Sequence, residues 1–126
     1  MSLRSPLGRA RGLGSAKEGT GHFWAQRVTA VALIPLTFMF VVIIFNFIGA
    51  DHAHAVALMG NPLVAVVVLM FIIASFYHSQ LGLQVVIEDY IQHAGLKTAS
   101  VLATSLGTMG LGIASVFAVL KLSFGG

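Results

Sequence analysis

A histidine, a glycine and an aspartate recur at helical spacing near the end of a long apolar segment. His78 is followed by Gly82 four residues later and by Asp89 eleven residues later, within the stretch YHSQLGLQVVIEDY. At about 100° per residue, eleven positions return to within roughly 20° of the start, so a helix places all three on one face. Neutral imidazole is a common iron ligand, and a glycine one turn away leaves room for a flat, bulky group. The spacing therefore favours a haem site at His78.

His78 lies deep inside its apolar segment. It precedes Ile87, the predicted end of the segment, by nine residues, or about 13 to 14 Å at 1.5 Å per residue. An ionisable side chain at that depth of a membrane is costly and indicates a functional site. A second interpretation stays open, namely a neutral histidine that hydrogen-bonds to a neighbouring helix. The remaining histidines lie outside the apolar segments: His22, His52, His54 and His93. A second axial ligand is therefore expected from a partner subunit, or from a methionine such as Met39 or Met109.

A carboxylate and a phenol stand side by side at the end of the same segment. A phenol donor next to a proton-exchanging acid can polarise a carbonyl oxygen and help to deliver protons to it, which is the chemistry open to Tyr90 and Asp89. Tyrosine is also common at membrane interfaces, and Glu88 with Asp89 fits a solvated helix end equally well. Carboxylates at this end of a helix oppose its dipole, which is a local cost without an evident structural return.

The elements that carry these residues are transmembrane helices. With 57% hydrophobic and 9% charged residues, the chain of 126 residues has too few polar groups to cover a soluble globule of its size. No stretch alternates polar and apolar residues long enough for barrel strands, so helices remain. Three apolar stretches approach the roughly 20 residues that cross a bilayer, at residues 28–48, 63–87 and 98–122. We therefore predict an all-α integral membrane protein with one domain, residues 1–126, that packs with a partner subunit into a helical bundle.

Basic residues are concentrated before the first apolar stretch. The first 27 residues contain Arg4, Arg9, Arg11, Lys17 and Arg27 against a single acid, Glu18. The first linker has no Lys or Arg, so the tail, residues 1–27, is expected on the cytoplasmic side of a bacterial inner membrane. The Arg- and Ser-rich, acid-poor start also resembles a mitochondrial transit peptide, which makes the mitochondrial inner membrane the alternative. The tail lacks the aromatic interleaving that stacks bases, so no nucleic-acid partner is predicted.

Small residues line one side of the third stretch, at steps of three or four. They are Ala99, Ala103, Gly107, Gly110, Ala114 and Ala118. Such a row lets another helix approach closely, and we expect it to serve packing. In the first linker, Asp51, His52 and His54 are expected to lack the fixed geometry of a metal site, because the linker should be flexible.

Two motifs together resemble a known family. The order H-x3-G followed by D-Y, formed by His78, Gly82, Asp89 and Tyr90, resembles the small D-type membrane anchor of succinate dehydrogenase, respiratory complex II. Residues 27–30, RVTA, resemble the R-x-T-A start of that family's first helix. The three-span layout also matches, so the resemblance covers nearly the whole chain.

The sister C-type anchor fits the sequence less well. That anchor typically has an H-R-x-T-G start and an R-H-L-x-x-D segment. In this chain Gln26 replaces the histidine, Ala30 replaces the glycine, and R-H-L does not occur. The D-type resemblance is therefore preferred.

The resemblance implies a role for each site residue. His78 would be one axial ligand of a haem b shared with the C-type cytochrome b anchor subunit, with Gly82 packing against the haem. Tyr90 would hydrogen-bond a ubiquinone carbonyl, with Asp89 in the supporting polar network. Arg27 would meet a haem propionate or lie near the quinone, and its alternative is a snorkelling, positive-inside arginine.

The resemblance also implies partners and a reaction. Electrons from succinate would pass through a flavoprotein subunit and an iron–sulfur subunit to quinone, while this chain contributes anchoring and no succinate-oxidising site. Trimers of such complexes are possible, and a fumarate reductase anchor is the closest alternative. A different class is a small transporter or proton-conducting subunit, in which His78 and Asp89 form a relay. The absence of a second intramembrane acid or base in the sequence counts against it. A third possibility is a purely structural membrane partner.

Overall fold

The computed structural model describes residues 3, 5–12 and 19–126. Arg4, Lys17 and Glu18 of the predicted cytoplasmic tail lie outside the described residues, as does the side chain of Arg9. The described helices are α1 (Pro6–Ala10), α2 (Gly19–Phe47), α3 (His52–Met59), α4 (Pro62–Tyr90) and α5 (Ala94–Ser123). The described part of the chain contains no strand, which confirms the all-α prediction.

Three of these helices, α2, α4 and α5, are long and apolar enough to cross a membrane. They have 29, 29 and 30 residues. At 1.5 Å per residue, each is roughly 45 Å long and exceeds the hydrocarbon core of about 30 Å. The helices therefore extend past the predicted apolar stretches: α2 begins at Gly19, well before Val28, and α4 continues to Tyr90, beyond Ile87.

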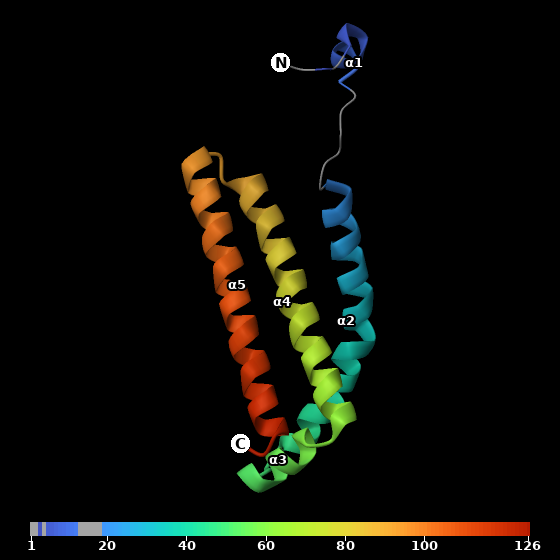
Figure 1. Ribbon diagram of the computed structural model, residues 1–126, viewed down its shortest axis with the longest axis vertical. Helices are drawn as coiled ribbons and strands as arrows, with labels where there is room; N and C mark the ends of the chain where they lie inside the picture. Colours follow the sequence, from blue (N-terminus) through green and yellow to red (C-terminus); the bar gives the residue numbers. More distant parts are fainter. Residues whose placement is uncertain (1–2, 4, 13–18) are drawn as a thin grey trace.

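Helix α4 lies between α2 and α5 and packs against both (Figure 1). The rings of Phe40 on α2 and Phe71 on α4 are stacked with centroids 4.1 Å apart. On the other side, a Cβ placed at Gly112 of α5 would meet Phe76 of α4 at 3.6 Å, so this glycine permits close approach. Since α4 is shared by both interfaces, it positions the site residues that it carries.

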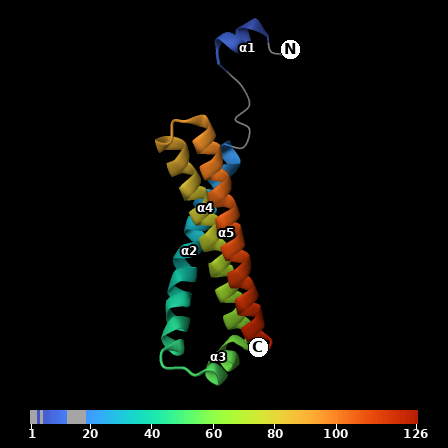
Figure 2. The ribbon, with the colours of Figure 1, turned by 90° about the vertical axis from the view of Figure 1, so that its left-hand side faces the viewer.

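The first linker is not the flexible segment expected from its sequence, because it contains α3. Asp51 caps this helix, and its Oδ1 accepts a hydrogen bond of 2.8 Å from the backbone N–H of His54. Figure 2 shows α3 at the end of the bundle where α2 stops and α4 begins. The same kind of cap starts α4, where Asn61 Oδ1 accepts from the N–H of Leu63 at 3.0 Å. Among the described residues, no group of three or more His, Cys, Asp or Glu side chains could hold a metal ion.

Most of the apolar surface faces outward. The buried hydrophobic residues of the described chain are Leu36, Met59, Ala65, Val68, Leu81 and Val119. The small-residue row of α5 is also exposed, and nothing lies within 4 Å of a Cβ placed at Gly107 or Gly110. A bilayer suits such a surface, because lipid tails solvate apolar side chains that water would not.

Candidate functional site

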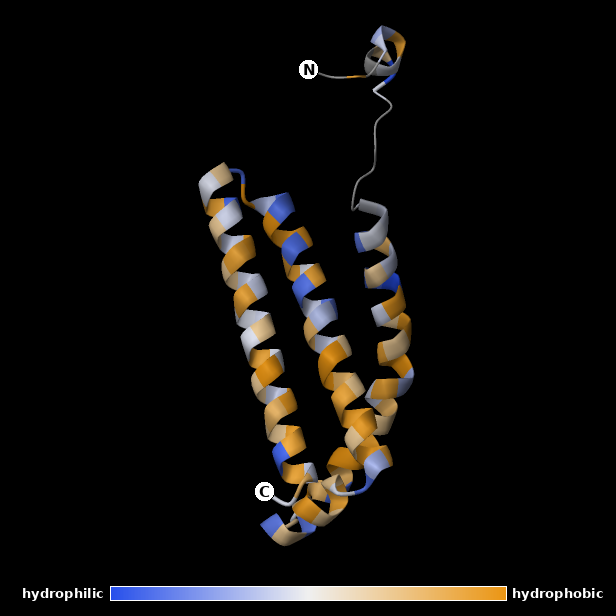
Figure 3. Cartoon of the chain, viewed as in Figure 1, coloured by the Kyte–Doolittle hydropathy of each residue, from blue (hydrophilic) through white to orange (hydrophobic). Residues whose placement is uncertain are grey.

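Polar residues gather at one end of the three-helix arrangement. Figure 3 shows hydrophilic residues in the second half of α4, whereas its first half is almost uniformly hydrophobic. The start of α2 lies beside this end of α4 because the two helices run antiparallel. Site residues from the two helices can therefore meet only where the second half of α4 faces the first half of α2.

His78 makes its contact across this interface. Its ring nitrogen Nδ1 lies 2.9 Å from the hydroxyl oxygen of Thr29 on α2. Thr29 is 9% exposed and is the buried polar residue of the described chain, while His78 is half-buried. The alternative of a histidine bonded to a neighbouring helix is thus observed, and the bond occupies one of the two ring nitrogens.

The surroundings of Thr29 determine which nitrogen has the proton. A hydroxyl has one proton to donate, and Thr29 Oγ1 lies 2.7 Å from the carbonyl oxygen of Ala25 and 3.2 Å from that of Gln26. Since the proton is directed to these carbonyls, the lone pairs of Oγ1 are placed to accept from His78 in the tautomer that has its proton on Nδ1. A neutral imidazole has one N–H, so Nε2 is left with a free lone pair. That nitrogen, with no hydrogen-bond partner among the described residues, is the one available to a metal.

Gly82 also faces α2, as its helical spacing from His78 predicts. A Cβ placed at Gly82 would lie 3.7 Å from the side-chain nitrogen of Gln26. Within this chain, the side-chain amide of Gln26 thus borders the space over Gly82, at a normal van der Waals distance. Gln26 is in turn buried at its Oε1 without a hydrogen-bond partner. The α2–α4 interface therefore contains a buried oxygen atom without a hydrogen-bond partner, opposite the turn of α4 that follows His78.

Asp89 and Tyr90 lie at the exposed end of α4. Tyr90 is the last residue of the helix and is 79% exposed, and Asp89 is exposed as well. The carboxylate of the preceding Glu88 accepts a hydrogen bond of 2.9 Å from Gln84 Nε2 on the same helix face. No hydrogen bond to the side chain of Asp89 or Tyr90 is formed by another described residue, so both groups are open to a partner or ligand.

Arg27 points away from the interface that His78 occupies. It is exposed, and its guanidinium carbon lies 4.9 Å from the centroid of the Phe23 ring. Arg27 and Thr29 are two positions apart, or about 200° around α2, so they occupy opposite sides of the helix. A cation–π contact of this kind attracts the guanidinium to the face of the ring.

A cavity of about 810 Å³ opens between the start of α2 and the end of α4. Its walls contain the polar side chains of His22, Gln80, Gln84 and Glu88, together with Tyr77. His22 was expected in a flank, but it lies in the first turns of α2, with its Nε2 buried and without a hydrogen-bond partner in the described chain. The cavity therefore combines room for water with a buried polar atom that needs a partner.

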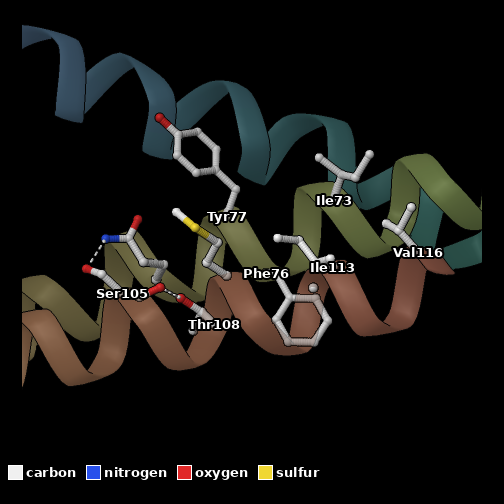
Figure 4. A pocket seen from close by; sticks show the side chains of 10 residues that line it. Ile73, Phe76, Tyr77, Ser105, Thr108, Ile113 and Val116 are labelled. Atoms are coloured by element: carbon white, nitrogen blue, oxygen red, sulfur yellow. Dashed lines mark hydrogen bonds between the residues drawn. The ribbon is translucent and has the colours of Figure 1, made fainter. Parts of the chain in front are cut away.

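A second cavity, of about 450 Å³, lies between α4 and α5 and is largely apolar (Figure 4). Its polar rim includes a hydrogen bond of 3.2 Å from Gln80 Nε2 to Ser105 Oγ. Tyr77 and Gln80 line both cavities, so one face of α4 borders the polar cavity at one end and the apolar cavity at the other.

Three site residues were not identified from sequence: His22, Gln26 and Thr29. They follow one another at steps of four and three, which places them on one face of α2. This spacing of polar residues at the start of an apolar helix was the available signal. In the sequence, Gln26 and Thr29 were considered only within family motifs, and His22 was placed in the flank of the first apolar stretch.

Comparisons with known proteins agree with one another. The family model described as "Succinate dehydrogenase/Fumarate reductase transmembrane subunit" matches residues 1–119. A succinate dehydrogenase hydrophobic membrane anchor subunit from Paracoccus denitrificans is 35% identical over 125 residues, covering 99% of this chain and 96% of that protein. A protein of the same description from Rickettsia bellii is 31% identical over 117 residues, covering 93% and 94% of the two chains. No solved structure gives a significant match.

Proposed function

Because the chain belongs to the succinate dehydrogenase/fumarate reductase transmembrane subunit family, it is a membrane anchor subunit, and we propose that it also supplies a haem ligand and part of a quinone site. In this proposal the complex oxidises succinate and reduces ubiquinone. This direction follows the relatives from Paracoccus denitrificans and Rickettsia bellii, which are described as succinate dehydrogenase subunits. A fumarate reductase anchor remains the second candidate, since the family description includes both.

The hydrogen bond between His78 and Thr29 carries the haem proposal. It supports an imidazole with Nδ1 protonated and Nε2 free, which is the form that ligates iron. An outer hydrogen bond of this kind also fixes the plane of the ring before a metal is bound. His78 would hold the iron of haem b through Nε2, and a C-type cytochrome b anchor subunit would provide the other axial ligand.

Haem b bound at His78 would supply one-electron chemistry inside the membrane. Thr29 would hold the ring in orientation, and Gly82 would keep the neighbouring turn of α4 free of a side chain. The first half of α4, which precedes His78 and is almost uniformly hydrophobic, would exclude water from the membrane interior.

The quinone proposal rests on Asp89 and Tyr90 at the exposed end of α4. Tyr90 would donate a hydrogen bond to a quinone carbonyl oxygen, and Asp89 would exchange protons with water beside it. The exposure of both residues supports a site completed by another subunit, because neither side chain has a partner in the described chain. We assign that completion to the iron–sulfur subunit, which in turn joins the flavoprotein.

Orientation follows from charge. Arg27 on α2 and Lys97 on α5 lie toward the end of the bundle where α4 stops, whereas Lys121 lies toward the other end. We therefore propose that this end of the bundle, with Asp89 and Tyr90, lies on the cytoplasmic side of a bacterial inner membrane.

Affinity purification through a tag on this chain tests the assembly. A flavoprotein, an iron–sulfur protein and a second small membrane protein are expected to copurify, with a b-type signal in the dithionite-reduced minus oxidised spectrum. A chain purified with none of these partners would contradict the proposed role, and a proton-conducting subunit would then be preferred. The molar mass of the purified particle would also decide whether complexes form trimers.

Replacing Tyr90 with phenylalanine is expected to slow electron transfer from succinate to ubiquinone on the order of 10- to 100-fold, because one hydrogen-bond donor to the quinone is lost. Succinate oxidation with a soluble artificial acceptor should persist at the wild-type rate. Phenylalanine keeps the ring, so assembly and haem content should not change. Unaltered quinone kinetics in Tyr90→Phe would remove Tyr90 from the site.

A further inference from the structure

Three polar side chains on α2 form a file that leads from the polar cavity to His78. His22 lines the cavity, Gln26 lies over Gly82, and Thr29 is hydrogen-bonded to the His78 ring. Steps of four and three residues place neighbouring members about 5 to 6 Å apart on one helix face. The file thus spans about 10 Å along α2 between His22 and Thr29.

Two atoms in this file are buried without a hydrogen-bond partner in the described chain: His22 Nε2 and Gln26 Oε1. Burial of an unpaired polar atom costs free energy, and such atoms are normally bonded to ordered water. Of the two residues, His22 lines the cavity. The cavity, with a volume of about 810 Å³, has room for several water molecules. It reaches the exposed start of α2 at Gly19 and Gly21 and the exposed carboxylate of Glu88 at the end of α4. Water in it would join His22 to the aqueous side.

We propose that His22 is a proton acceptor coupled to reduction of the haem that His78 holds. This inference rests on the proposed function of His78. Reduction of a haem held there, by one electron from the iron–sulfur partner, would be accompanied by uptake of one proton from water at the His22 imidazole. On reoxidation the electron would pass to the quinone, and His22 would release its proton to water. No other bond is made or broken, and the net charge of the buried region is unchanged over the combined step.

The attraction between the electron added to the haem and a proton on His22 determines the size and sign of the coupling. One added electron at about 10 to 15 Å, with an effective dielectric constant near 20, changes proton affinity roughly tenfold. Imidazole is the side chain that ordinarily gains or loses its charge between about pH 5 and 8. Among the described residues, the other titratable groups lining the cavity are Tyr77 and Glu88, both on α4, the helix that packs against α2. Glu88 is the competing proton acceptor and is therefore included in the test.

Redox titration of the haem in the purified complex, at several pH values between about 5.5 and 8.5, tests the proposal over the range in which imidazole titrates. The wild-type midpoint potential is expected to fall as pH rises, because reduction is favoured when a proton is available. The total change in midpoint potential should approach about 59 mV, which corresponds to a tenfold change in proton affinity for a one-electron couple. His22→Gln and His22→Asn should each keep the haem spectrum and lose the pH dependence.

His93→Gln is the matched control. His93 is an exposed histidine that caps α5 near the same end of the bundle and lies outside the cavity, so its replacement should preserve the wild-type slope. Glu88→Gln should also preserve the slope of midpoint potential against pH. Loss of that slope in Glu88→Gln alone would identify Glu88 as the proton acceptor and overturn the assignment to His22. A pH-independent wild-type potential, or an unchanged slope in both His22 variants, would overturn the coupling while leaving the haem proposal intact. A complex without any b-type signal would overturn both.

Discussion

Replacing His78 with alanine is expected to abolish the b-type absorbance of the assembled complex, or to reduce haem content to a small fraction of the wild-type value. The lone pair on Nε2 is the only iron ligand that this chain is proposed to offer, and no other described side chain lies at that depth with an equivalent nitrogen. A haem with one of its two axial ligands removed loses much of its binding free energy, because a single bond from the partner subunit then holds the iron. Haem per complex, measured by pyridine haemochrome against flavin, provides the readout.

His93→Ala serves as the control for the His78 variant. It removes a histidine of the same chain whose ring caps α5 and is exposed to solvent, so haem content should stay at the wild-type level. Imidazole added to the His78→Ala complex should restore part of the haem spectrum, since the truncated side chain leaves a cavity of matching shape. A His78→Ala complex with normal haem content and spectrum would remove His78 from the ligand set.

Sequence predicted the three long helices well because each is a continuous apolar run, and membrane length is a strict requirement. It missed α3, because HAHAVALM is short and its residues are only moderately apolar, so nothing distinguishes it from a linker before the Asp51 cap is seen. The predicted span, residues 28–48, follows the apolar run, whereas α2 itself begins at Gly19. Hydropathy marks the edge of the hydrocarbon core, whereas the helix continues for about two and a half turns beyond it because its backbone hydrogen bonds need no lipid.

The site was predicted on one helix, whereas the contacts of His78 and Gly82 reach a second helix, α2. Periodicity within α4 places His78 and Gly82 on one face, and both do face α2. Periodicity cannot identify what that face contacts, because Thr29 is 49 residues away in the sequence. The tautomer of His78 depends on that contact, and through it on two backbone carbonyls of α2. The protonated nitrogen of His78 is therefore set by a contact between two helices, which the sequence of one helix does not contain.

The outward-facing row of small residues on α5 shows a similar limit. Its spacing predicted close packing of another helix, yet α4 packs on the opposite side of α5, against Gly112. Spacing reveals that a helix has a surface suited to close approach, but not which helix occupies it. The row therefore stays a prediction for the assembled complex.

Replacing Thr29 with valine is expected to weaken haem binding by roughly 10- to 100-fold, the usual effect of removing a hydrogen bond behind a ligating histidine. Valine has nearly the same shape as threonine, so the helix interface should persist, but Nδ1–H of His78 is left without its acceptor. A buried unpaired donor of this kind costs about 1 to 3 kcal/mol. The ligand also becomes a weaker electron donor, which stabilises the oxidised iron less and should raise the midpoint potential.

Thr108→Val is a closely matched control for this change. Thr108 Oγ1 donates within its own helix to the carbonyl oxygens of Thr104 at 2.8 Å and Ser105 at 3.2 Å, the same pattern that Thr29 makes on α2. In the described chain it has no hydrogen bond to another helix. Any cost of losing the intrahelical bond is therefore common to both variants, and the difference between them isolates the bond to His78. Haem retention on dilution and the midpoint potential should change in Thr29→Val alone; equal effects in the two variants would mean that Thr29 does not prepare His78 for iron.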